Sequence, residues 1–183
     1  RDRMGFVVGI GGYWDLEAVV TYFTTGHYRE RPDGPWRRAQ PNAYGKWVFV
    51  LSNVEQLESA ADRAILDRMA RLKFDDPDAD IAKLAARLGP EGRAVYALLD
   101  NADPERVPAL LAALPAGVKA EFAALNLKGR DVSRLSAQLI LIHGRDDTII
   151  PYTESVALAA ALPKEQAELY LVDSLAHVDL GPT

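Results

Sequence analysis

The stretch LILIHGRDDTIIPYTESVALAAAL, residues 139–162, decides the fold together with AELYLVDSLAH, residues 167–177. Each stretch opens with a short apolar run that is typical of a buried strand. A helix fits residues 153–162 between the two runs. Apolar strands joined by a helix imply a parallel sheet with a right-handed crossover. The sequence therefore predicts neighbouring parallel strands at about 139–142 and 169–172.

An acid and an imidazole follow these two predicted strands. Asp147 lies a few residues after the first strand and His177 a few residues after the second. Because parallel strands end at the same edge of a sheet, both side chains are expected at one edge. A carboxylate there can fix the tautomer of the imidazole, as in a nucleophile–His–acid triad. The alternative is a turn aspartate and an unrelated surface histidine.

The first half of the chain predicts one more strand and many helices. The run FVVGI at 6–10 is a third buried strand, and Asp15 is the expected N-cap of a helix that Gly26 ends. Residues 27–42 are rich in Pro, Gly and Arg and predict an irregular connection. Residues 42–127 predict five or six short helices.

The predicted fold class is α/β, in one structural domain overall. Residues 1–13 supply the first strand, residues 14–130 a helical insertion, and residues 131–183 the β-α-β unit with the two loops.

Composition limits the classes of function. The chain has 183 residues, no cysteine and a net charge of -5. These values exclude thiol chemistry and disfavour nucleic acid as a partner. Since no apolar run is long enough for a membrane span, we expect a soluble protein, cytoplasmic by default. The chain begins with Arg1 and reaches its first strand at once, so we expect that its true beginning lies elsewhere.

The two loops resemble those of α/β-hydrolases. That family's acid loop commonly runs Gly-x-x-Asp followed by a Val/Ile-Pro pair, and residues 144–151 read GRDDTIIP. The resemblance implies that Asp147 is the triad acid. The stretch AELYLVDSLAHVDL is similar to the family's last strand and catalytic histidine loop, which implies that His177 is the base. The opening FVVGIGGYWDLEAVV resembles the strand after which helical caps begin, so the expected architecture is a partial α/β-hydrolase sheet of about three parallel strands with a large all-helical cap.

The chain departs from this family in one respect. The family's serine lies on a G-x-S-x-G elbow, and this sequence has none. The glycines at 9–12 come without a hydroxyl or a thiol. The resemblance thus implies a fragment of a serine-type hydrolase that supplies the acid and the base for an ester or acyl bond, and that is inactive alone. Its expected partners are the missing N-terminal half and a small acyl substrate.

A non-enzymatic alternative stays open. The first strand would expose the edge at which a further strand belongs, and an unpaired strand is a template for association. The chain would then be a truncated module that binds a partner or a second copy of itself through that edge.

Several other residues are weaker candidates. Tyr13 and Trp14 follow the first strand and could line a substrate pocket or pack the first helix. Asp146 is the rival for the acid role, and His143 is expected to be a hydrogen-bonded structural histidine. The three histidines lack metal-ligand spacing, so neither a metal nor a cofactor is predicted. The serines all lack an elbow context: Ser52, Ser133, Ser136, Ser155 and Ser174.

A basic cluster lies in the predicted irregular connection. It could bind an acidic ligand, or it could be a solvated loop. Its members are Arg29, Arg31, Arg37 and Arg38, with Tyr28 and Trp36 among them.

Overall fold

The computed structural model describes residues 5–132, 135–173 and 175, and its fold is mixed α/β. The chain divides into two compact units. The sheet unit comprises residues 1–22, 27–40 and 126–183, and the helical unit comprises residues 23–26 and 41–125.

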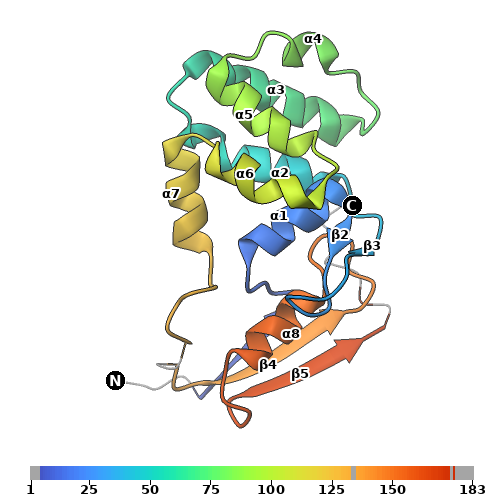
Figure 1. Cartoon of the computed structure of the whole chain (residues 1–183), viewed down its shortest axis with the longest axis vertical. Coiled ribbons are helices and arrows are strands. Elements are labelled where there is room, and N and C mark those ends of the chain that lie inside the picture. The colour runs from blue at the N-terminus through green and yellow to red at the C-terminus, as the bar shows by residue number, and fades with distance from the viewer. Residues whose placement is uncertain (1–4, 133–134, 174, 176–183) are drawn as a thin grey trace. The chain divides into compact units, whose positions relative to one another are not determined.

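The sheet unit is built on the predicted three-stranded parallel sheet (Figure 1). Its strands are β1 (Phe6–Ile10), β4 (Gln138–Gly144) and β5 (Ala167–Val172), in the order β1-β4-β5. Helix α8 (Thr153–Ala160) joins β4 to β5 and contacts both. Since β4 is central and Gly144 pairs with Val172, the loops after β4 and β5 leave the sheet at the same edge.

Residues 6–10 form the predicted strand β1, but the prediction that this strand is buried is wrong, because β1 is an edge strand with exposed apolar side chains. Phe6, Val8 and Ile10 are 61%, 47% and 58% exposed. The N–H of Gly11 donates to the carbonyl of Ile142 (3.0 Å), and the carbonyl of Gly5 accepts from β4 (3.1 Å). In a parallel ladder the alternate residues then direct their N–H and C=O groups away from β4. Within the described residues no strand pairs with this outer edge of β1.

Helix α1 (Leu16–Thr25) begins and ends where its signals predict. The Asp15 carboxylate accepts the N–H of Glu17 (3.0 Å), and Gly26 has a φ of 74°, which glycine adopts without strain. Val19 and Val20 lie on its buried face.

The prediction of an irregular connection at 27–42 is wrong in one respect. Two-residue strands β2 (His27–Tyr28) and β3 (Arg37–Arg38) pair there in antiparallel orientation. Strands of two residues are too short for an alternating pattern, so no sequence signal predicts them. The pairing sets Tyr28 opposite Arg37, and cross-strand neighbours share one face of the ribbon.

The helical unit contains six α-helices between residues 42 and 127, in agreement with the prediction. They are α2 (Tyr44–Asn53), α3 (Ala60–Asp75), α4 (Ala82–Ala85), α5 (Pro90–Leu99), α6 (Val107–Ala112) and α7 (Ala116–Leu125), with 3-10 turns η1 (Val54–Gln56) and η2 (Pro104–Arg106). Their apolar faces form a core that includes Leu66, Met69, Leu98 and Val118.

A buried carboxylate fastens α3 to α5 in this unit. Asp62 is 1% exposed, and its two oxygens accept the N–H groups of Gly89 (2.6 Å) and Gly92 (2.9 Å). These donors belong to the first turn of α5, where a negative charge is stabilised by the helix dipole. A Cβ at Gly92 would lie 2.9 Å from the Asp62 carboxyl carbon, so this contact requires glycine.

Among the described residues no single helix is long and apolar enough to cross a membrane. Only the bent pair Pro104–Ala112 and Ala116–Leu125, which turns by 116°, meets that criterion when taken together.

Candidate active site

The acid loop, residues 144–151, holds the Asp147 carboxylate in a buried and fixed position. One oxygen, Oδ1, accepts the N–H groups of Ile149 (2.8 Å) and Ile150 (2.9 Å). The other oxygen, Oδ2, lies 3.3 Å from Nε2 of His143. Only 2% of the Asp147 side chain is exposed. These contacts of the acid loop therefore fix the orientation of the carboxylate.

The rival aspartate has a different environment. Asp146 is exposed, whereas its neighbour Asp147 is buried and hydrogen-bonded. A residue that must hold an imidazole needs a fixed geometry, so the burial pattern favours Asp147 over Asp146 for the acid role.

His143 is the buried histidine that the sequence predicts to be structural, and its hydrogen bonds confirm this. Its Nδ1 lies 2.7 Å from Oγ of Ser155, and its Nε2 lies 3.1 Å from the carbonyl of Ile150 and close to Asp147. Both neighbours of Nε2 are acceptors, so Nε2 carries a proton. In the neutral ring Nδ1 then accepts from the Ser155 hydroxyl.

These contacts connect serine, histidine and aspartate, yet the arrangement is inaccessible. Ser155 and His143 are both 0% exposed. A nucleophile must reach its substrate, and Ser155 lies inside the first turn of α8 with its Oγ also 3.3 Å from the carbonyl of Gly12. We interpret the Ser155–His143–Asp147 chain as a support for the acid loop.

A second buried acid, Glu154, ties α8 to the loop after β1. Its Oε2 accepts the N–H groups of Trp14 (3.0 Å) and Asp15 (2.6 Å). Burial raises the pKa of this carboxyl to about 7, although the two backbone donors and Lys128 act in the opposite direction. The residues after β1 and the acid loop thus share one anchor, the first turn of α8.

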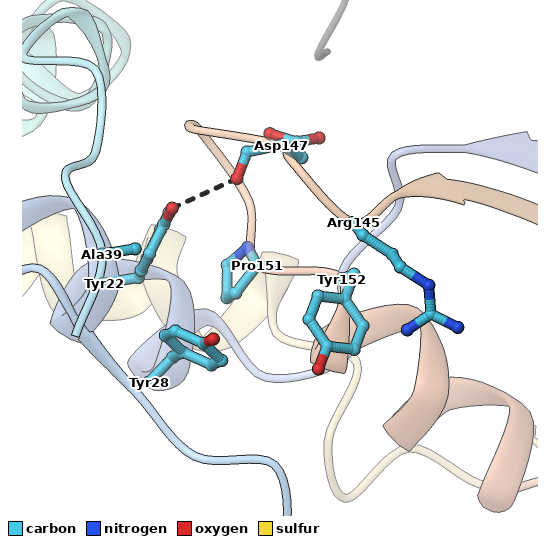
Figure 2. A pocket seen from close by; sticks show the side chains of 7 residues that line it. All are labelled: Tyr22, Tyr28, Ala39, Arg145, Asp147, Pro151 and Tyr152. Carbon is cyan, nitrogen blue, oxygen red and sulfur yellow. Dashed lines mark hydrogen bonds between the residues drawn. The ribbon is translucent and has the colours of Figure 1, made fainter. Parts of the chain in front are cut away.

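Tyr22 is a contact of the acid loop that sequence reasoning missed. Its hydroxyl donates to the carbonyl of Asp147 (3.1 Å), as Figure 2 shows. Burial, followed by the charge of Asp147 and by Tyr28, raises the pKa of Tyr22 to about 12. The hydroxyl therefore stays protonated and remains a donor. The sequence pattern does not predict this hydrogen bond, because the spacing of Tyr22 is that of any buried residue in an amphipathic helix.

A small cavity of about 30 Å³ opens beside the acid loop (Figure 2). It is lined by Tyr22, Tyr28, Ala39, Arg145, Asp147, Pro151 and Tyr152. The predicted pocket residues Tyr13 and Trp14 are not among them. Trp14 bonds through its backbone to Glu154 and Lys128, and burial raises the pKa of Tyr13.

The predicted base, His177, lies outside the described residues. The chain that leads to it is described as far as Leu175, except for residue 174. The N–H of Arg145 donates to the carbonyl of Val172 (2.9 Å), and a Cβ at Gly144 would overlap the carbonyl oxygen of Leu175. Glycine at 144 thus lets the loop after β5 pass directly over the start of the acid loop.

No site for a metal emerges from the described part of the chain, which contains no cluster of three histidine or acidic side chains with suitable spacing.

Comparisons with known proteins show no family. No protein-family model and no curated protein matches the chain. Among solved structures it is similar to a meta-cleavage product hydrolase, at 16% identity, with 94% of this chain and 49% of that chain covered and a TM-score of 0.27. It is also similar to a thermophilic esterase from Thermogutta terrifontis, at 18% identity, with 76% and 46% covered and a TM-score of 0.27.

Both of these proteins have α/β-hydrolase folds, and the chain spans about half of their length. Since these TM-scores are low, any function must be argued from the chain's own residues.

The raised pKa of Glu154 predicts a pH-dependent stability. The folded pKa of about 7 exceeds the ordinary value of 4.5, so folding takes up a proton between these pH values. The resulting stabilisation is complete below pH 4.5 and is lost as the pH rises through 7, by roughly 3 kcal/mol at most. Urea unfolding between pH 5 and pH 8 measures this loss.

Glu154→Gln keeps an acceptor for both backbone donors and removes the titration, so we expect a flatter pH profile. Glu17→Gln, at an exposed position of α1, should keep the wild-type slope. Equal slopes for wild type and Glu154→Gln would contradict the assignment.

Proposed function

We propose that this chain supplies the acid, Asp147, and the base, His177, of a serine hydrolase relay. The observation that supports this most is the buried Asp147 carboxylate, which two N–H groups and His143 hold at the carboxyl end of β4. The loop that carries His177 leaves the neighbouring strand β5 at the same edge. This is the position at which parallel sheets gather their catalytic groups.

In the proposed reaction, Asp147 accepts a hydrogen bond from one imidazole nitrogen of His177. The other nitrogen takes the proton of a serine hydroxyl as its oxygen attacks the carbonyl carbon of an ester or related acyl bond. The imidazolium returns this proton to the leaving group, and an acyl-serine remains. Water then attacks the acyl-serine with the same base, which releases the acid and the free serine.

The serine of this relay lies on a segment outside these 183 residues. Ser155 is buried and engaged in the support of the acid loop. The other serines of the chain lack the strand-to-helix elbow that exposes a nucleophile. The chain alone is therefore expected to hydrolyse nothing.

Substitutions of the neighbouring residues Asp147 and Asp146 test the relay. The assay is ester hydrolysis by a polypeptide that is extended upstream of Arg1 to include a G-x-S-x-G serine. Asp147→Asn and His177→Ala should each lower kcat/KM for a short-chain aryl ester by roughly 10³-fold to 10⁴-fold. Asp146→Asn alters an exposed neighbour and should leave the rate unchanged. A similar loss in Asp146→Asn, or none in Asp147→Asn, would refute the assignment.

The exposed edge of β1 favours a second candidate function, which is association with another copy of the chain. Phe6, Val8 and Ile10 expose apolar side chains and direct backbone groups outward. Edge strands are normally protected by charges or proline, and β1 carries neither. An antiparallel pair of β1 strands would set Val8 opposite Val8 of the second copy, with two-fold symmetry.

This candidate predicts a dimer that a charge on the edge disrupts. Val8→Lys should convert the chain to a monomer in light scattering after size exclusion, because a lysine on an edge strand blocks further pairing. Leu125→Lys changes an equally exposed apolar residue of α7, 49% exposed against 47%, and should leave the dimer intact. A wild-type chain that stays monomeric at its highest soluble concentration would exclude self-association.

A further inference from the structure

The cavity beside the acid loop has rigid aromatic walls that the relay does not use. The rings of Tyr22 and Tyr28 meet edge to face, with centroids 6.0 Å apart, and those of Tyr28 and Tyr152 are 6.3 Å apart. Pro151 completes the wall below the acid loop (Figure 2). A volume of about 30 Å³ holds one or two waters, so the cavity admits one small functional group of a ligand.

The cavity is lined by three tyrosine hydroxyls, the Arg145 guanidinium and one acid, Asp147, whose carboxylate already contacts two N–H groups and His143. The Tyr22 hydroxyl already donates to Asp147. By contrast, the hydroxyls of Tyr28 and Tyr152 make no hydrogen bond to another described residue. Arg145 adds a guanidinium, which has donors only, and its central carbon lies 5.7 Å from the Tyr152 ring centroid. Such a set suits an acceptor with negative charge.

Two arginines near this cavity, Arg145 and Arg37, form only weak ion pairs that a ligand could replace. Arg145 is half exposed and is 3.8 Å from an almost fully exposed Asp173. Arg37, which pairs across the ribbon with Tyr28, is 3.5 Å from Glu30, and both are about half exposed. Exposed ion pairs of this length contribute little, so a ligand can replace them.

The charges of Arg145, Arg37 and one acid, Glu30, act on the Tyr152 hydroxyl. Burial raises the pKa of Tyr152 most, Glu30 and Tyr28 raise it further, and Arg145 and Arg37 lower it. In the structure Arg145 lies 5.7 Å from the Tyr152 ring centroid, and Arg37 pairs with Glu30. Glu30 is the group that an incoming anion must displace.

We propose that this tyrosine–arginine pocket, defined by Tyr28, Tyr152 and Arg145, binds a carboxylate group of a small ligand. The planar guanidinium matches the two carboxylate oxygens, and the two hydroxyls donate from the cavity wall. A cationic group would meet Arg145 at the rim, and a neutral group would leave the guanidinium without a new partner. Resting on the proposed function, this pocket assigns to the hydrolase an acyl substrate that carries a carboxylate near its scissile bond.

Binding of propionate to the full 183-residue chain tests the pocket directly. Propionamide is nearly the same shape without the charge and serves as the control ligand. Propionate should shift amide resonances of the acid loop saturably in ¹H–¹⁵N spectra at constant ionic strength, with a Kd on the order of 1–10 mM. Propionamide should cause no saturable shift.

Three variants make the assignment specific. Arg145→Gln, at a half-exposed position, should weaken propionate at least tenfold, and Tyr152→Phe should weaken it severalfold. Glu30→Gln removes the internal competitor and should tighten binding. Arg130→Gln changes an exposed arginine of the same unit that does not line the cavity, and should leave the Kd unchanged.

Equal binding of propionamide, no saturable shift, or an unchanged Kd in Arg145→Gln would overturn the proposal. This titration needs neither a serine nor His177. Its failure would therefore leave the relay standing, and a failed relay would leave the carboxylate pocket standing as a binding site.

Discussion

The buried carboxylate of Asp147 is the group around which this edge of the sheet is organised. Transfer of an ionised carboxylate out of water is costly unless hydrogen bonds replace its hydration. Here two backbone N–H groups and the His143 ring meet that need and also determine where the carboxylate points. The same hydrogen bonds stabilise the conformation of the acid loop. The conformation of the loop and the orientation of the Asp147 carboxylate therefore depend on the same contacts.

The support behind this carboxylate extends to the first turn of α8. His143 bonds to Ser155, Ser155 lies against the carbonyl of Gly12, and Glu154 holds the loop after β1. Two of these links join residues 143 and 140 positions apart, and the side chains of His143, Ser155 and Glu154 are buried. A change in one link is expected to reach the acid loop, because a buried polar group without its partner is expensive. We interpret the Ser-His-Asp connection found here as scaffolding for one carboxylate.

The sequence was most informative where local patterns and tertiary structure agree. Apolar runs gave all three strands of the sheet, and the Asp15 and Gly26 signals gave the ends of α1. The sequence did not predict contacts between segments that are far apart along the chain. Tyr22 resembles any buried helical residue, and its bond to Asp147 depends on how α1 meets a loop 125 positions later. The hairpin at 27–38 is too short for a pattern, so the sequence revealed its arginines but not that Arg37 faces Tyr28. The place of His177 remains a prediction.

The central claim is that Asp147 accepts a hydrogen bond from His177. Proton NMR of the chain in water reads this directly, since an imidazole N–H held by a carboxylate gives a strongly downfield resonance that exchanges slowly. Our account predicts such a resonance from His177, in addition to any from Nε2–H of His143, that disappears in His177→Ala and in Asp147→Asn and persists in Asp146→Asn. His143 also faces Asp147, so the loss in His177→Ala is what assigns the signal. If His177→Ala removes no downfield imidazole resonance from the spectrum, the account is contradicted.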